Sequence, residues 1–114
     1  MPVNSRQKGK RVERDFVLHA KEQGYSTARR TSQVCGAAKS VHGDGVADVI
    51  IDELSKIHFE VKGGAVIRLY DAVDQVKGDK GANLGVIAHK RDRGEWLFTM
   101  VAEDFWGLMR GDHL

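Results

Sequence analysis

Two short β-rich segments only four residues apart constrain the fold of this chain most strongly. The segments VADVIID (46–52) and IHFEVK (57–62) are rich in β-branched and aromatic side chains, which favour strands. The polar residues 53–56 fit a tight connection between antiparallel strands, and Gly63–Gly64 ends the second strand. The sequence therefore predicts a hairpin in which residue 48 lies opposite about residue 61, close enough to place Asp48 beside Glu60.

The segments on both sides of this hairpin predict helices and further strands. Apolar residues recur at helical spacing over residues 5–23 and again over 67–80, and glycines end both segments. Residues 33–45 are rich in glycine and small side chains, which is typical of a loop. The other elements, three strands and a closing helix, are expected at residues 25–32, 83–89, 95–101 and 102–110. This order predicts an α/β fold with a mixed central sheet flanked by helices.

The chain length and composition exclude several classes of protein. A chain of 114 residues allows one domain, assigned to residues 1–114, since domains commonly contain about 100–150 residues. No apolar run approaches the roughly 20 residues that span a bilayer, and the N-terminus has no apolar signal core. The one cysteine, Cys35, excludes an internal disulfide and a thiolate metal cage, and we expect it to pack as a small residue. We therefore expect a cytoplasmic protein that does not insert into membranes.

Positive charge is concentrated in the N-terminal part of the chain. Residues 1–40 contain nine Lys or Arg and three acids, so they carry +6, and since the whole chain carries +2 the remainder sums to −4. Such an asymmetry is typical of proteins that bind polyanions, although solvated helices show the same pattern. The candidate phosphate contacts are Arg6, Lys8, Lys10, Arg11, Arg14, Arg29 and Arg30. These contacts would position a DNA duplex without reading its sequence.

Two acids and a lysine in the predicted hairpin indicate a chemical site. Side chains alternate between the two faces of a strand, so Glu60 and Lys62 share one face, and Asp48 joins them from the neighbouring strand. Both acids stand within apolar segments, where a charge is unfavourable without a partner. The alternative is a surface salt bridge, or an acid that blocks the edge of a sheet.

Two adjacent carboxylates repel each other and require a cation. Oxygen ligands favour Mg²⁺, with Mn²⁺ as a substitute, and the backbone carbonyl of Val61 would add a further oxygen. Lys62 beside such an ion would help to position and deprotonate a water, or would stabilise charge on a phosphorus centre. Gly63–Gly64 leaves space for a phosphodiester backbone. These residues predict metal-dependent hydrolysis of phosphodiesters.

The residues of this site resemble those of a known superfamily. The PD-(D/E)XK nucleases, which include restriction endonucleases and the archaeal Holliday junction resolvases, share the pattern of Glu13, Asp48 and Glu60-Val61-Lys62. Ala47 stands where the family motif has a proline. The resemblance implies a restriction-endonuclease-like fold with the core order helix, three strands, helix, strand (αβββαβ).

Two further features are similar to the resolvases. The basic segment RQKGKRVER (6–14) introduces an apolar helix, and Gln75 stands on the helix that follows the motif. The resemblance as a whole covers about residues 5–90 of the 114. It therefore extends over most of the expected core.

The resemblance implies a role for each of these residues. The implied metal ligands are Asp48, Glu60, the carbonyl of Val61 and, directly or through a water, Glu13. Lys62 would be the catalytic lysine, and Gln75 would lie behind the ligands or orient a water. A serine after the first strand contributes in related resolvases, and Ser32 is the nearest match, with Ser40 as the alternative.

The other residues that could take part in catalysis or binding give weaker indications of function. The histidines show no metal-ligand spacing, and the segment HGDG (42–45) holds too few ligands for a metal. That segment is expected to contact the substrate, or to be a plain connection. The large apolar side chains of residues 96–109 are expected in the core, and part of them would suit a self-association face.

Taken together, the residues and the resemblance predict a Mg²⁺-dependent endonuclease that acts on four-way DNA junctions. A homodimer is expected, because paired cuts on opposing strands require two symmetrically placed sites. A compact resolvase of this kind is typical of a virus or a prokaryote. Two alternatives stay open: a related nuclease that acts on other branched, single-stranded or duplex DNA, and a catalytically inactive DNA-binding module.

Overall fold

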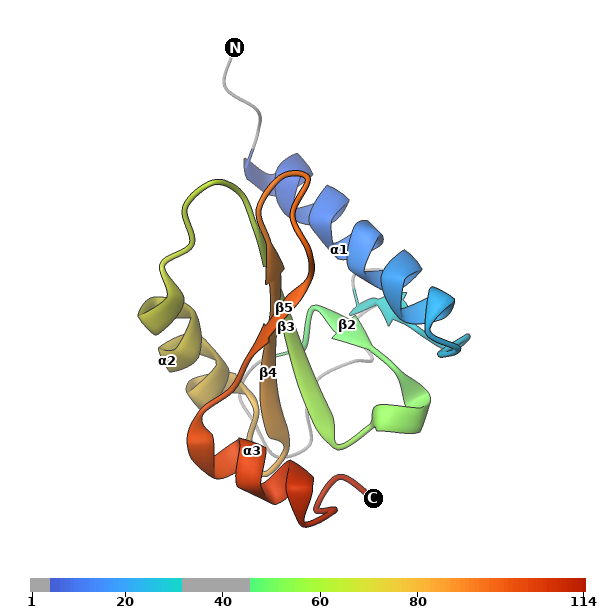
Figure 1. The fold of residues 1–114 in the computed structure, drawn as a ribbon, viewed down its shortest axis with the longest axis vertical. Helices are drawn as coiled ribbons and strands as arrows, with labels where there is room; N and C mark the ends of the chain where they lie inside the picture. Colours follow the sequence, from blue (N-terminus) through green and yellow to red (C-terminus); the bar gives the residue numbers. More distant parts are fainter. Residues whose placement is uncertain (1–4, 32–45) are drawn as a thin grey trace.

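A five-stranded mixed sheet forms the centre of the computed structural model, which describes residues 5–31 and 46–114 (Figure 1). The strands lie side by side in chain order: β1 (Arg29–Arg30), β2 (Val49–Ile50), β3 (Ile57–Gly63), β4 (Leu84–Lys90) and β5 (Leu97–Thr99). β3 and β4 are parallel, and the other neighbouring pairs are antiparallel. The predicted α/β class with a mixed sheet flanked by helices is confirmed.

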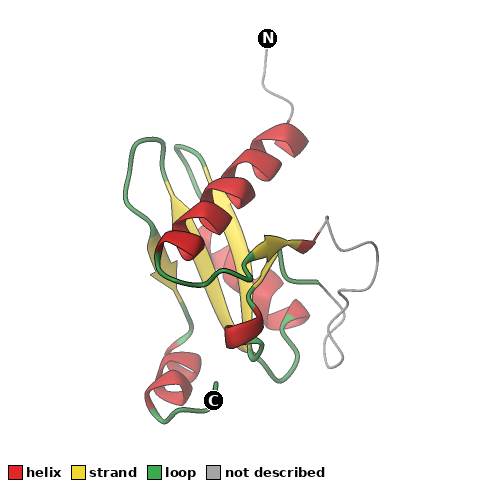
Figure 2. Cartoon of the chain, turned by 90° about the vertical axis from the view of Figure 1, so that its right-hand side faces the viewer, coloured by secondary structure: helices red, strands yellow, loops and turns green. Residues whose placement is uncertain are grey.

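Helices cover both faces of this sheet. α1 (Ser5–Glu22) crosses one face, and Figure 2 shows it in front of the strands. α2 (Leu69–Asp79) packs on the opposite face and joins β3 to β4, because parallel neighbours need a crossover connection. α3 (Ala102–Met109) packs at the beginning of β4, where Asp104 Oδ2 accepts a hydrogen bond of 3.0 Å from the Gly85 N–H.

Each face of the sheet has its own hydrophobic core. The larger core lies under α1 and includes Phe16, Phe59 and Val61, while the smaller core joins α2 to β4. Because side chains alternate along β3, the residues between the core positions of the α1 side point toward α2. The chemical side chains of β3, Glu60 and Lys62, therefore lie on the α2 side of the sheet.

The N-terminal half of α1 passes very close to the end of β3, and glycines permit this approach. A Cβ atom added to Gly63 would lie 2.6 Å from Cγ2 of Val12. Gly64 has a φ of +117°, and a Cβ atom there would lie 2.9 Å from the Nζ of Lys8. The close approach brings the basic turns of α1 to the end of the strand that carries Glu60 and Lys62.

Several predicted element boundaries differ from the structure. The helices and the strands β3 and β4 lie within two residues of their predicted bounds, but β1, β2 and β5 are much shorter than the predicted strands. The connection after β2 contains a 3₁₀ turn at Asp52–Leu54. Val49 pairs with Phe59, so Asp48 lies opposite residue 60, one residue from the approximate prediction of 61 and beside Glu60 as expected. None of the helices in the described ranges is long and apolar enough to cross a membrane.

Candidate functional site

The carboxylates of Asp48 and Glu60 lie beside each other where β2 joins β3. Asp48 directly precedes β2, and Glu60 stands in the middle of β3 with only 1% of its surface exposed. Oδ2 of Asp48 accepts a hydrogen bond of 2.8 Å from the backbone N–H of Val61. The side chain of Asp48 thus occupies the place of a strand carbonyl, and this contact holds its carboxylate at the edge of β3.

Burial raises the pKa of Asp48 from 3.8 to about 8, and the negative charge of Glu60 acts in the same direction. The charge of Glu13 adds a smaller contribution, and the hydrogen bond from Val61 lowers the pKa against this trend. At neutral pH the carboxyl group of Asp48 therefore holds a proton when no cation is present. A divalent cation would replace that proton and neutralise both carboxylates, so these two side chains fit an oxygen-ligated metal ion.

The backbone carbonyl of Val61 lies at the same edge of β3. The N–H and C=O groups of a strand residue point toward the same neighbouring strand, and the N–H of Val61 points toward Asp48. β2 begins only at Val49, so it does not extend along the sheet to meet this carbonyl. The oxygen of Val61 is therefore directed toward the space beside Asp48, where it can serve as a further ligand.

Lys62 is held by Gln75 from the opposite helix. The Nζ of Lys62 donates a hydrogen bond of 3.0 Å to Oε1 of Gln75. A hollow of about 210 Å³ adjoins both side chains and is also lined by Gly63, Arg68 and Asp71. From the sequence, Gln75 was predicted to support the metal ligands from behind or to orient a water molecule. In the structure its contact is with Lys62, whose ammonium group it orients.

Glu13 and Arg30 form an ion pair on the α1 side of the site. The Nε of Arg30 donates to Oε1 of Glu13 at 3.1 Å, and 5% of Arg30 is exposed. The pair places Glu13 close enough to influence the pKa of Asp48. The predicted contact of Arg30 with phosphate is not favoured by this arrangement, because its guanidinium group is buried and paired. Arg30 instead anchors Glu13 to β1.

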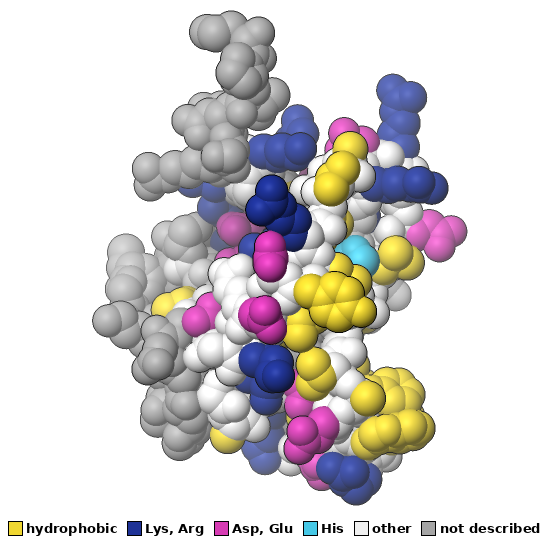
Figure 3. Space-filling view, turned by 90° about the vertical axis from the view of Figure 1, so that its left-hand side faces the viewer, with side chains coloured by type: hydrophobic (Ala, Val, Ile, Leu, Met, Phe, Trp, Pro, Cys, Tyr) yellow, Lys and Arg dark blue, Asp and Glu magenta, His cyan; other side chains and the backbone are white. Residues whose placement is uncertain are grey.

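The other residues predicted to contact phosphate differ in their exposure and in their ion pairs. Arg11 and Arg14 on α1 are exposed, and Lys8 and Lys10 are half-buried. Arg29 forms an exposed ion pair of 3.0 Å with Asp52. On the side of the molecule that carries α2, Lys and Arg side chains lie mainly toward the upper end (Figure 3). Several predicted positions lie outside the described residues or side chains, namely Arg6, Ser32, Cys35, Ser40 and residues 42–45.

His58 belongs to the site although its spacing gave no signal as a metal ligand. Its Nε2 lies 2.8 Å from Oε1 of Glu60, and both side chains are about 98–99% buried. His58 stands two residues before Glu60 and so lies on the same face of β3. Alternation along the strand could therefore have predicted that His58 lies on the same face as Glu60. It could not have predicted the close contact between the two side chains, which depends on tertiary packing.

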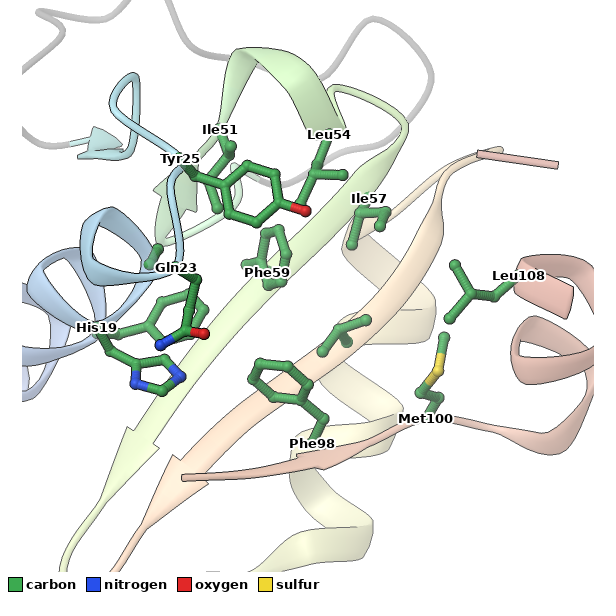
Figure 4. A pocket seen from close by; sticks show the side chains of 13 residues that line it. His19, Gln23, Tyr25, Ile51, Leu54, Ile57, Phe59, Phe98, Met100 and Leu108 are labelled. Atoms are coloured by element: carbon green, nitrogen blue, oxygen red, sulfur yellow. The ribbon is translucent and has the colours of Figure 1, made fainter. Parts of the chain in front are cut away.

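A separate apolar pocket lies on the α1 face of the sheet. It has a volume of about 340 Å³, and Figure 4 shows Phe59, Phe98, Met100 and Leu108 around it, with His19 and Gln23 at one side. The carboxylates of Asp48 and Glu60 do not line it. This pocket is therefore distinct from the polar site on β3.

Comparisons with known proteins returned no match, either to a protein-family model, to a curated protein or to a solved structure. The functional interpretation therefore rests on the residues and the geometry of the site itself.

Proposed function

We propose that this protein is a Mg²⁺-dependent endonuclease that hydrolyses phosphodiester bonds at four-way DNA junctions. The observation that carries the proposal is the arrangement of Asp48, Glu60 and Lys62 on two neighbouring strands. The carboxylate of Glu60 is buried and that of Asp48 beside it is partly buried, and Lys62 stands two residues after Glu60. Adjacent carboxylates in such a place are costly for folding and useful for phosphoryl chemistry. The order α1, β1, β2, β3, α2, β4 supports assignment to the restriction-endonuclease-like PD-(D/E)XK nucleases.

The metal would be held by Asp48, Glu60 and the carbonyl of Val61, with Glu13 reaching it directly or through a water. When bound, Mg²⁺ or Mn²⁺ lowers the pKa of a water and offsets negative charge on a phosphate. The residues of the chain supply the rest. Lys62 donates hydrogen bonds to the reacting phosphate or to the attacking water, and Gln75 keeps its ammonium group in place. His58 orients the carboxylate of Glu60.

Two hollows at the end of β3 support a path for a nucleic acid backbone. One adjoins Lys62 and Gln75, and the other, of about 550 Å³, is lined by the loop from Gly64 to Ile67 and by the end of β4 with Lys90 and Arg91. The ammonium group of Lys8 lies over Gly64 between these elements. Phosphates that follow this path would pass the cationic groups and reach Lys62, two residues after Glu60.

Exposed apolar side chains on β5 and α3 support a homodimer. Phe98, Trp106 and Met109 are 57–60% exposed, and β5 is the last strand of the sheet. Figure 3 shows hydrophobic side chains gathered along this side of the molecule. Two copies joined there would present two sites for paired cuts. Light scattering should give a dimer for the wild type and a monomer for Trp106→Asp, with Tyr70→Asp on α2 as an exposed control.

The alternatives differ in substrate or in chemistry. A nuclease for other branched, single-stranded or duplex DNA would use the same site, because substrate type depends on loops and on dimer geometry. A catalytically inactive DNA-binding module would not need the adjacent carboxylates of Asp48 and Glu60, which favours the enzyme.

The test is cleavage of a labelled immobile four-way junction beside a linear duplex with the same arm sequence. Each substrate is incubated with Mg²⁺, with Ca²⁺ or with a chelator. Symmetric paired nicks in the junction alone, dependent on Mg²⁺, are the expected result. Equal cleavage of both substrates would support the proposed nuclease activity but contradict its selectivity for four-way junctions. Binding without cleavage under every condition would reject the enzyme in favour of the inactive module.

A further inference from the structure

A second cluster of metal-ligating side chains lies behind the carboxylate pair. His58, Glu60 and Asp79 each offer one ligand atom, and these atoms all lie within 4.8 Å of one another. His58 and Glu60 lie on the same face of β3, and Asp79 is the last residue of α2. The packing of Ala72 and Val76 against the sheet brings the last turn of α2 over that face. The cluster therefore depends on tertiary packing and not on a sequence motif.

In the part of the chain that the structure describes, the acids of this cluster, Glu60 and Asp79, form no ion pair with Lys or Arg, and the one pairing contact of Glu60, 2.8 Å to His58, is internal to the cluster. Lys62 is bonded to Gln75, and Lys80, which follows Asp79, donates to the carbonyl of Asn83 and pairs with Asp104. Two carboxylates with an imidazole between the sheet and α2 thus form a partly buried acidic site, and burial without a cation is unfavourable.

The donor set differs from that of the site at Asp48. An imidazole nitrogen together with carboxylate oxygens favours borderline cations such as Zn²⁺ and Co²⁺, whereas oxygen atoms alone favour Mg²⁺. The cluster is reachable, because Asp79 is partly exposed and a cavity of about 150 Å³ lined by Ala47, Ile50 and Asn83 reaches His58.

We propose that His58, Glu60 and Asp79 bind a second divalent cation of the Zn²⁺ and Co²⁺ class. The three protein ligands leave room for water in the remaining coordination positions. Glu60 belongs both to this cluster and to the Mg²⁺ site of the proposed function. That sharing rests on the proposed function, but the existence of the second cation site does not.

The test is a titration of the metal-free full-length chain with Co²⁺, followed by displacement with Zn²⁺. The visible absorption of Co²⁺ reports a nitrogen- and oxygen-ligated site, and calorimetry gives the affinity for Zn²⁺. The variants are His58→Gln and Asp79→Asn, with Asp74→Asn, an exposed carboxylate on the same helix, as the matched control. Asp79→Asn changes a partly exposed helix end, so it tests the site even if His58→Gln fails to fold.

The expected result is a Co²⁺ spectrum for the wild type and for Asp74→Asn. The affinity for Zn²⁺ should fall in His58→Gln or Asp79→Asn by more than about 100-fold, the upper range for groups that do not touch the metal. A wild type without a Co²⁺ spectrum, or unchanged binding by both variants, would overturn the proposal.

Asp48→Asn separates this inference from the proposed function. We expect the variant to keep the Co²⁺ spectrum and to lose Mg²⁺-dependent cleavage. If Asp48→Asn abolished Co²⁺ binding and His58→Gln retained it, the ion would lie at Asp48, and the second site would be rejected while the nuclease stands. If Co²⁺ binding followed the expected pattern but no DNA were cleaved by the wild type, only the proposed function would fail.

Discussion

The carboxylate of Asp48 accepts the backbone N–H of Val61 at 2.8 Å, so a side chain takes the place of a main-chain acceptor in the sheet. This bond connects the first acid of the candidate site to the strand residue that follows the second acid. The position of the Asp48 carboxylate is therefore determined by the backbone of β3 and not by a flexible side-chain contact. A site held in this way is pre-organised for a cation beside Glu60.

Asp48→Asn should abolish cleavage and preserve or strengthen binding to a four-way junction. The amide oxygen can still accept the N–H of Val61, so the fold is retained. The carboxylate that would bind a metal is lost, while the cationic side chains proposed to contact phosphate are unchanged. Cleavage assays and gel-shift titrations measure the two effects, with Asp74→Asn as the control. Full activity in Asp48→Asn would remove this residue from the site.

The stability of the metal-free protein should fall as the pH rises from about 4 to about 8. The folded state raises the pKa of Asp48 from 3.8 to about 8, so over this interval it binds a proton that the unfolded chain releases. The contribution is complete below the lower pKa and is lost through the upper one, with a limiting slope of about 1.4 kcal/mol per pH unit. Urea unfolding of the wild type and Asp48→Asn in chelator measures the difference. Parallel pH profiles for the two proteins would contradict the prediction.

Gln75→Ala should lower the rate of cleavage by about 10- to 100-fold with little change in substrate affinity, because Gln75 orients Lys62. Lys62→Ala should lower the rate of cleavage by about 10²–10⁴-fold. The double variant should cleave no more slowly than Lys62→Ala alone. Single-turnover cleavage on a junction measures all three, and Asp74→Ala on the same helix controls for changes in α2. Additive losses in the double variant would show that Gln75 acts independently of Lys62.

Arg11→Ala and Arg14→Ala should each weaken DNA binding and reduce the slope of log affinity against log salt by about one. Both side chains are exposed on the basic side of α1. Binding measured over a series of salt concentrations gives the slope, and Lys21→Ala, near the far end of the same helix, is the control. If the slope stayed at its wild-type value in both variants, the basic side of α1 would face away from the DNA.

Arg30→Ala should destabilise the fold by about 3 kcal/mol, because it leaves Glu13 partly buried without its cation. Arg29→Ala is the matched control on the same strand. Its ion pair with Asp52 is exposed, so its loss should cost about 0–1 kcal/mol. Denaturant unfolding measures both. Equal stability of the two variants would mean that the Arg30 pair contributes no more than a surface ion pair.

Much of the fold could be predicted from local patterns in the sequence. The helical spacing of apolar residues before Gly24 and around Val76 predicted α1 and α2, and the β-rich segment from Ile57 predicted β3. The lengths of the edge strands could not be predicted in this way. β2 begins only at Val49, and Asp48 before it bonds to the N–H of Val61 through its side chain, a contact that no propensity describes.

In the candidate site, too, local patterns predicted some of the contacts and only tertiary packing determined the others. Alternation along one strand placed Glu60 and Lys62 together, and the proximity of the two β-rich segments added Asp48. The burial of Arg30 against Glu13, the bond between Lys62 and Gln75, and the position of His58 beside Glu60 were not predictable in this form. The first two contacts join residues from different elements that lie far apart in the chain. His58 and Glu60 share a face of β3 by alternation, but the distance between their side chains is set by packing.

The sequence by itself determined which segments form helices and strands and which chemical groups share a face of β3. These properties follow from the periods of the helix and the strand, which act over a few residues. Only the tertiary structure decided which charges are paired, which carboxyl group holds a proton and which acids surround His58. The reason is physical, because desolvation and charge interactions depend on distances between groups that packing brings together across the chain.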